Sequence, residues 1–222
     1  MMLERLVCYS LARCGDTPHL GQLLRSVASL RRYNATVPVW VFTYGDLPDS
    51  AANWLKARDV EVRLVGGYFS CLRKLSQHAE ALSTYPVLPK YLSLIELAEV
   101  EVSQLLCPDC DTFFFDDVAT LFQRYYDAEW YGREEPYSPL SPYFDPDYID
   151  PRELAALVES LGLRAVPTLN IGALLLNHGL HARVAPLLGS MLDYVSRFMM
   201  WLSAAPDFSG KLPFETPVPA NG

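Results

Sequence analysis

The sequence predicts one α/β domain built on a mostly parallel sheet, and three observations support this fold class. Short apolar runs alternate with helical patterns in β-α-β-α-β order from residue 6 to residue 64. This order predicts parallel strands joined by right-handed crossovers. The chain has 222 residues, of which 50% are hydrophobic, so it can bury one sizeable core. No internal repeat interrupts the pattern.

Each element of the first half follows from its own pattern. Leu20 to Leu30 place Leu and Val at three- and four-residue spacing, which predicts an amphipathic helix that ends near Tyr33. A second helix is expected from Ser50, as its N-cap, to Arg58. The strands are expected at the apolar or alternating runs 6–11, 37–42 and 60–64.

The second half continues with further strands and helices and then loses its periodicity. A Pro-rich loop at 133–151 has five prolines after Glu135 and is a candidate binding lid. The tail 206–222 is also Pro-rich and is expected to be irregular, so the domain is assigned to 1–205. Helices are expected at 88–98, 118–125 and 152–161, and strands at 102–107, 128–131 and 171–176.

Charge and cysteine content exclude some classes of partner and compartment. The formal net charge is −8, and Lys and Arg are scattered, so we expect no nucleic-acid partner. The apolar stretch 180–205 is interrupted by charged residues, and the start of the chain lacks a signal-peptide pattern, so no membrane span is expected. Five cysteines, an odd number in a chain of this size, favour reduced thiols in the cytoplasm.

Two carboxylates follow the expected strand 102–107. In an extended strand the side chains of Asp109 and Asp111 would project to the same side, with Cys110 on the other. Repulsion between two carboxylates this close raises the pKa of one of them unless a counter-charge is present. A divalent cation, which prefers oxygen ligands, provides such a counter-charge. The carboxyl end of a parallel strand is also where open α/β sheets bind ligands. Taken alone, the pair is more typical of a surface loop than of a metal site.

The residues around this pair resemble the GT-A glycosyltransferases. In that family a strand ends in Asp-x-Asp, followed by Thr, an apolar triplet and a polar turn into a helix, and residues 106–118 are similar throughout. Downstream, residues 168–177 resemble the family's Phe-Asn-x-Gly-Val-x-Leu-x-Asn strand. The resemblance covers 5–188 and implies a GT-A, Rossmann-like sheet flanked by helices.

The resemblance also implies how a donor would bind. It implies a UDP- or GDP-linked sugar, with Mn²⁺ or Mg²⁺ held by Asp109 and Asp111. Lys90 falls where such enzymes often carry a basic residue facing the donor, although a Lys near a helix start is often merely exposed. The other donor-binding residues implied are Tyr9, Ser10 and Asp46 near the nucleoside, with Asn170 at the sugar and Gly172 allowing close backbone approach.

The acceptor side departs from the family pattern. The family often supplies a third metal ligand after the last motif, where this chain offers only His178 and His181. No acceptor-facing acidic residue is identifiable downstream, so we expect the domain to be incomplete at Gly222. Glu134 and Glu135 are candidate general bases for an inverting reaction, although they also fit a solvated turn. The acceptor itself is not identifiable.

Other functions remain open at this point. Cys107 and Cys110 match Cys-x-x-Cys, but a structural zinc needs four ligands and no second cysteine pair exists, so we expect ordinary thiols. A sugar nucleotidyltransferase normally has a Gly-rich phosphate loop after its first strand, and residues 9–13 have no glycine. The main alternative is a catalytically idle domain that binds nucleotide sugars.

Overall fold

The structure is a computed structural model that describes residues 3–15, 17–75, 88–134 and 169–188. The chain divides into two compact units. One comprises Met1–Gly132 with Ile171–Trp201, and the other comprises Arg133–Asn170 with Leu202–Gly222. The expected helix 152–161 and the tail 206–222 lie outside the described residues, so the fold is described for the first unit.

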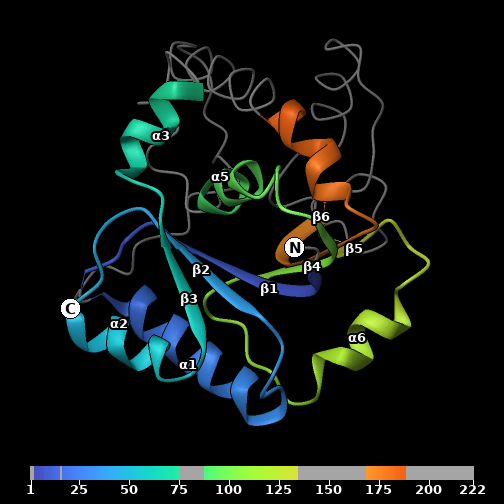
Figure 1. Cartoon of the computed structure of the whole chain (residues 1–222), viewed down its shortest axis with the longest axis horizontal. Coiled ribbons are helices and arrows are strands. Elements are labelled where there is room, and N and C mark those ends of the chain that lie inside the picture. Colours follow the sequence, from blue (N-terminus) through green and yellow to red (C-terminus); the bar gives the residue numbers. More distant parts are fainter. Residues whose placement is uncertain (1–2, 16, 76–87, 135–168, 189–222) are drawn as a thin grey trace, which may run out of the picture. The chain divides into compact units, whose positions relative to one another are not determined.

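A six-stranded sheet in the order β3-β2-β1-β4-β6-β5 forms the centre of this unit (Figure 1). β1 pairs in parallel with β2 and β4, and β2 pairs in parallel with β3. β6 runs antiparallel to β4, so the sheet is mostly parallel, as the sequence predicted. The strands are β1 (Leu3–Leu11), β2 (Val39–Thr43), β3 (Val60–Leu64), β4 (Val102–Pro108), β5 (Trp130–Glu134) and β6 (Leu169–Asn177).

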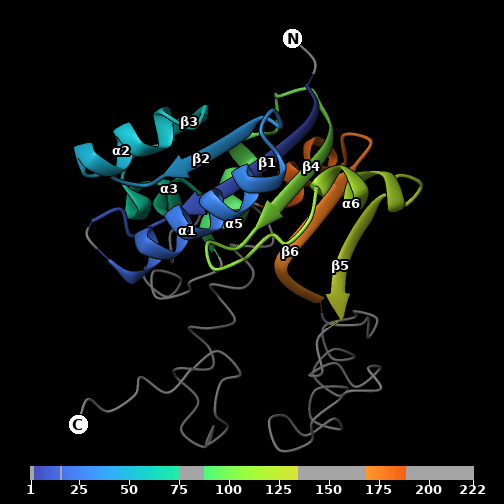
Figure 2. The same ribbon diagram turned by 90° about the horizontal axis from the view of Figure 1, so that it is seen from below.

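Helices cover both faces of the sheet (Figures 1 and 2). One core joins the strands to α1, α2 and α6 and includes Leu23, Leu55 and Phe122. The core on the other face joins them to α3, α5 and the helical residues 180–188. The helices are α1 (Pro18–Tyr33), α2 (Asp49–Lys56), α3 (Tyr68–Leu75), α5 (Leu88–Glu96) and α6 (Val118–Arg124).

Helix α1 shows how the sequence specifies one of these layers. Thr17 is its N-cap, because the Thr17 hydroxyl accepts a hydrogen bond from the backbone N–H of Leu20 at 3.3 Å. Pro18 fits the first turn because proline has no N–H to satisfy. The apolar stripe predicted from Leu20 to Leu30 is buried against the sheet, and full burial of each such side chain contributes about 1.5–3 kcal/mol.

The side chain of Asn34 ties the end of α1 to the start of α6. Its Nδ2 donates to the carbonyl of Leu30, and its Oδ1 accepts from the backbone N–H of Val118 at 2.8 Å. Asn34 is buried and both polar atoms of its side chain are bonded. Residues 34–36, Asn-Ala-Thr, match a glycosylation sequon, but the buried Asn34 side chain is inaccessible in the folded chain.

Some local predictions were wrong. Helix α2 begins at Asp49 after Pro48 and has no side-chain cap, so Ser50 lies inside the helix. The sequence did not predict α3, which follows Gly66 and Gly67 and so lacks a Ser, Thr, Asp or Asn start signal. No described helix has the length and apolar character needed to cross a membrane.

Candidate functional site

Asp109 and Asp111 lie in a turn directly after β4. The strand ends at Pro108, and the backbone N–H of Thr112 donates to the carbonyl of Asp109 at 3.1 Å. The expectation that both carboxylates project to one side assumed an extended strand, so that argument does not apply here. Asp109 is 48% exposed and Asp111 is exposed, so both can reach solvent at the carboxyl end of β4.

Lys90 contacts the first of these aspartates. Its Nζ donates to Oδ1 of Asp109 at 2.6 Å, and its own side chain is only 7% exposed. A charge-assisted hydrogen bond of this length is stronger than one between neutral groups. The neighbouring Leu88 and Pro89, at the start of α5, are also buried. The structure therefore brings the predicted donor-facing lysine to the predicted metal-binding aspartate.

Strand β6 brings Gly172 to the same turn. The backbone N–H of Asp109 donates to the carbonyl of Gly172 at 2.6 Å, and the Thr112 hydroxyl donates to the same carbonyl at 3.4 Å. The two sequence motifs, about sixty residues apart in the chain, thus meet through their backbones. Asn170 precedes Gly172 in β6, but its side chain lies outside the described residues.

The two cysteines of the Cys-x-x-Cys sequence lie on opposite faces of the sheet. Cys107 belongs to the core on the α5 side. Cys110 packs against the core on the α1 side, and its thiol donates to the carbonyl of Ser10 at 3.4 Å. Among the described residues no group of three or more His, Cys, Asp or Glu could hold a metal ion. Their places on opposite faces keep the two thiols apart, and their role as ordinary thiols stays a prediction.

The environment of Cys110 is electrostatically negative. Burial raises the pKa of its thiol to about 12, and the carboxylates of Asp109 and Asp111 add to this effect. The ammonium of Lys90 opposes them.

The residues expected at the nucleoside occupy different environments. Tyr9 is fully buried on the α1 side, where its hydroxyl lies 2.8 Å from that of Ser26, so only its backbone remains as a candidate donor contact. The hydroxyl of Ser10 lies 2.6 Å from that of Ser93. Asp46 is exposed in the turn after β2.

The two histidines considered as a third metal ligand lie at the opposite end of the strands, beside the amino end of β4. Because β6 is antiparallel to β4, its end at Asn177 pairs with Gln104, whereas its start lies beside Pro108. His178 bonds to the carbonyl of Tyr126, and His181 bonds to that of Val100. Neither histidine therefore joins Asp109 and Asp111.

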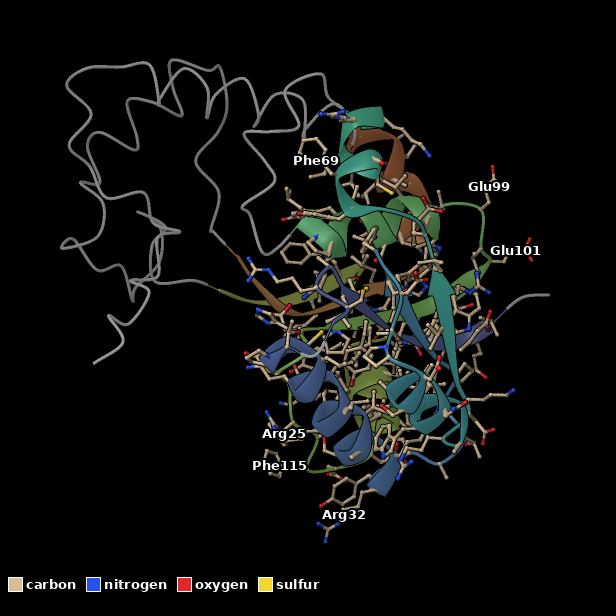
Figure 3. All side chains as sticks on the ribbon, turned by 90° about the vertical axis from the view of Figure 1, so that its left-hand side faces the viewer. Arg25, Arg32, Phe69, Glu99, Glu101 and Phe115 are labelled. Carbon is tan, nitrogen blue, oxygen red and sulfur yellow. The ribbon has the colours of Figure 1, made fainter. Side chains whose placement is uncertain are left out.

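A cavity of about 390 Å³ lies beside these histidines, at the amino end of β4. His178 and His181 line it together with Glu99 and Glu101, which lie in the loop leading into β4 (Figure 3). The cavity is thus at the amino end of β4, away from the turn of Asp109.

The role of Glu134 and Glu135 as candidate general bases stays a prediction. Glu134 is the last residue of β5, but its side chain lies outside the described residues. Glu135 and the rest of the loop 133–151 also lie outside them.

Sequence reasoning missed two residues next to the site, Tyr44 and Ser93. Both are buried and hydrogen-bond to the start of α5, beside Lys90. The sequence carries only a weak signal for these two residues. Ser93 follows Lys90 by about one helical turn, and Tyr44 directly follows the second strand.

Comparison with solved structures finds this fold in sugar transferases of low sequence identity. Mouse xyloside xylosyltransferase 1 matches with a TM-score of 0.52 and 14% identity, over 91% of this chain and 75% of that one. The galactosyltransferase LgtC, in complex with donor and acceptor sugar analogues, matches with a TM-score of 0.55 and 14% identity, over 88% and 66%. The mannosyltransferase Ktr4p from S. cerevisiae matches with a TM-score of 0.51 and 10% identity, over 88% and 62%.

The chain thus spans between 62% and 75% of the length of these proteins. No protein-family model matches the sequence, and no curated protein matches it significantly. At 10–14% identity, the likeness to these structures shows the fold alone. The structure therefore has the GT-A fold that these glycosyltransferases share.

Proposed function

We propose that the chain is a metal-dependent glycosyltransferase that moves a sugar from a nucleoside-diphosphate sugar to an acceptor. The observation that carries this proposal is the contact of Lys90 with Asp109 at the carboxyl end of β4, on a GT-A sheet. Open α/β sheets bind ligands at this position. An ammonium and two carboxylates there are suited to a diphosphate and its counter-ion.

The donor chemistry of the turn fits a divalent cation such as Mn²⁺ or Mg²⁺. Asp109 and Asp111 offer carboxylate oxygens that reach solvent. Mg²⁺ in particular is usually held by one or two carboxylates together with substrate phosphates and water, so a third protein ligand is not required. When bound, such a cation would neutralise the charge that develops on the leaving nucleoside diphosphate.

The chain's own residues would hold and orient the donor. Lys90 keeps Asp109 in place and puts a positive charge beside the expected diphosphate. The carbonyl of Gly172 accepts the N–H of Asp109, which fixes the turn against β6. Transfer requires the bond between the anomeric carbon and the diphosphate to break while an acceptor hydroxyl attacks. Preorganised charges at the leaving group lower this barrier.

The acceptor side of the proposal depends on the loop 133–151. Glu134 or Glu135 would accept the proton of the attacking hydroxyl in an inverting reaction. Asn170 would contact the donor sugar. The structure of LgtC is a complex with donor and acceptor sugar analogues, and Ktr4p has been solved with GDP. The GDP complex supports a GDP-linked donor for this chain, and the sequence motifs leave a UDP-linked donor equally open.

A second candidate is an idle domain that binds nucleotide sugars without turnover. The observation that favours it lies on the acceptor side, because no acceptor-facing acidic residue is identifiable downstream of residues 168–177. For either candidate we propose a reducing compartment such as the cytoplasm, where the five free cysteines would stay thiols.

A donor screen separates the two candidates. Hydrolysis of a panel of UDP- and GDP-sugars is measured with and without Mn²⁺ for the parent, Asp109→Asn and the control Asp116→Asn, which changes another exposed carboxylate. A glycosyltransferase should hydrolyse at least one donor slowly, with Mn²⁺, in the parent and the control but not in Asp109→Asn. Binding without hydrolysis in every case would favour the idle domain.

A further inference from the structure

A buried polar network lies next to the Lys90–Asp109 pair. The hydroxyl of Ser93 lies 2.6 Å from that of Ser10 and 3.1 Å from that of Tyr44. The carbonyl of Pro89 accepts hydrogen bonds from Tyr44 at 3.1 Å and from Ser93 at 2.9 Å. Ser93 and Tyr44 are 1% and 4% exposed. The network therefore joins β1 and the end of β2 to the first turn of α5.

This network fixes the residue that precedes Lys90 in the chain. Pro89 has no N–H, so the carbonyl is the one backbone group of this residue that can form a hydrogen bond. Bonds to this carbonyl therefore hold α5 at Pro89. Two hydroxyls converge on that carbonyl, one from within α5 and one from the sheet. A shift of Pro89 would move the backbone of Lys90, whose ammonium must stay within hydrogen-bond distance of Asp109.

Ser10 makes a second connection between the same elements. Its hydroxyl bonds to Ser93 in α5, and its carbonyl accepts the thiol of Cys110 in the turn after β4. The turn is thus linked to α5 twice, once through Lys90 and once through Ser10.

From this geometry we propose that Tyr44 and Ser93 are positioning residues that hold Lys90 on Asp109 through the carbonyl of Pro89. The consequence for donor binding rests on the proposed function of Asp109, whereas the positioning itself does not.

The hydroxyl of Tyr44 is suited to this role at neutral pH. Burial raises the pKa of Tyr44 well above its ordinary value, so the phenol keeps its proton and remains a donor. Its ring packs edge to face against that of Tyr68, with centroids 5.8 Å apart. Tyr44→Phe therefore removes the hydroxyl and keeps the ring that fills the core.

The matched control is Tyr9→Phe. Tyr9 is as deeply buried as Tyr44, and its hydroxyl bonds to one serine, Ser26, but on the opposite face of the sheet. Both variants lose a buried tyrosine hydroxyl, and only Tyr44→Phe loses one that reaches α5.

The direct readout is the exchange rate of the Lys90 ammonium protons in ¹⁵N-lysine NMR spectra. The chain has four lysines, so Lys90→Met assigns the signal. Tyr44→Phe and Ser93→Ala should speed this exchange by up to about tenfold, as the loss of one hydrogen bond allows. Tyr9→Phe should leave it unchanged. Equal exchange in the parent and Tyr44→Phe, with both Phe variants equally destabilised, would overturn the proposal.

A second readout tests the link to donor binding. The affinity for GDP and UDP with Mn²⁺ is measured for Tyr44→Phe alone and in the Lys90→Met background. The hydroxyl should matter only while Lys90 is present, so the two changes should be non-additive. Full additivity would mean that Tyr44 acts apart from Lys90 and would contradict the proposal. If the parent binds no nucleotide, the proposed function fails, and the NMR result alone still decides the positioning.

Discussion

The Nζ atom of Lys90 lies 2.6 Å from Oδ1 of Asp109 and joins the first turn of α5 to the turn after β4. The two partners differ in exposure, since the lysine side chain is 7% exposed and that of the aspartate 48%. Loss of the carboxylate therefore deprives a buried cation of an anionic partner. Asp111, two residues further on, is exposed, so the two aspartates should differ in their contribution to stability.

We expect Asp109→Ala to lower the free energy of unfolding by about 1–3 kcal/mol, the cost of removing one partner from a buried polar group. Asp111→Ala should stay within about 0.5 kcal/mol of the parent, as is usual for an exposed side chain. Urea denaturation of both variants measures the difference. Equal losses would show that the ion pair with Lys90 does not stabilise the fold.

The raised pKa of Cys110 predicts an unreactive thiol. Burial brings this pKa to about 12, with Asp109 and Asp111 adding to the effect, so little thiolate is present at pH 8. Alkylation of Cys110 by iodoacetamide should be slow and should still be rising with pH at pH 10. Asp111→Asn should accelerate it by removing a negative neighbour, whereas Asp116→Asn should not. A plateau in rate near pH 9 would contradict this electrostatic account.

The same shift predicts how stability depends on pH. The folded pKa of Cys110 lies above that of an unfolded thiol, about 8.5. As pH rises, the unfolded chain therefore loses this proton first, which favours unfolding. The contribution of Cys110 to stability should be complete below about pH 8.5 and be lost as pH rises toward 12. Cys110→Ala should flatten the fall in stability between pH 8.5 and 10, and an unchanged slope would refute this assignment.

The loop 133–151 is predicted to serve the acceptor. Its prolines limit the entropy lost on closure, and its aromatic residues could cover a bound sugar. Glu134→Gln and Tyr143→Ala should reduce transfer to an acceptor while leaving nucleotide-sugar affinity nearly unchanged. If either substitution weakens donor binding about tenfold, or 1.4 kcal/mol, with circular dichroism unchanged, the loop belongs to the donor site.

The sequence predicted most of the sheet because its strands have strong local patterns. The run 60–64 alternates in polarity and forms β3 with the bounds expected. The apolar spacing from Leu20 to Leu30 identified α1 to within two residues of its start. Helix α3 was missed because no N-cap residue type precedes it, and the direction of β6 was not predicted because pairing with β4 depends on distant residues.

The candidate site was predicted in part for a similar reason. The chain-local motifs pointed to Asp109, Lys90 and Gly172, and the structure brings these three together. The strand-based geometry of Asp109 and Asp111 was wrong, because β4 ends one residue before the pair. The Tyr44–Ser93 network is formed by residues 49 positions apart, so no local pattern could identify it.

Titration calorimetry of UDP and GDP tests the central claim that Asp109 and Asp111 hold a donor diphosphate through a divalent cation. In the parent, Mn²⁺ should raise the affinity for at least one nucleotide by about tenfold or more, or at least 1.4 kcal/mol. Asp111→Ala should abolish this gain, and Asp116→Asn should keep it. An equal affinity for both nucleotides with and without Mn²⁺, or an undiminished gain in Asp111→Ala, would contradict the account.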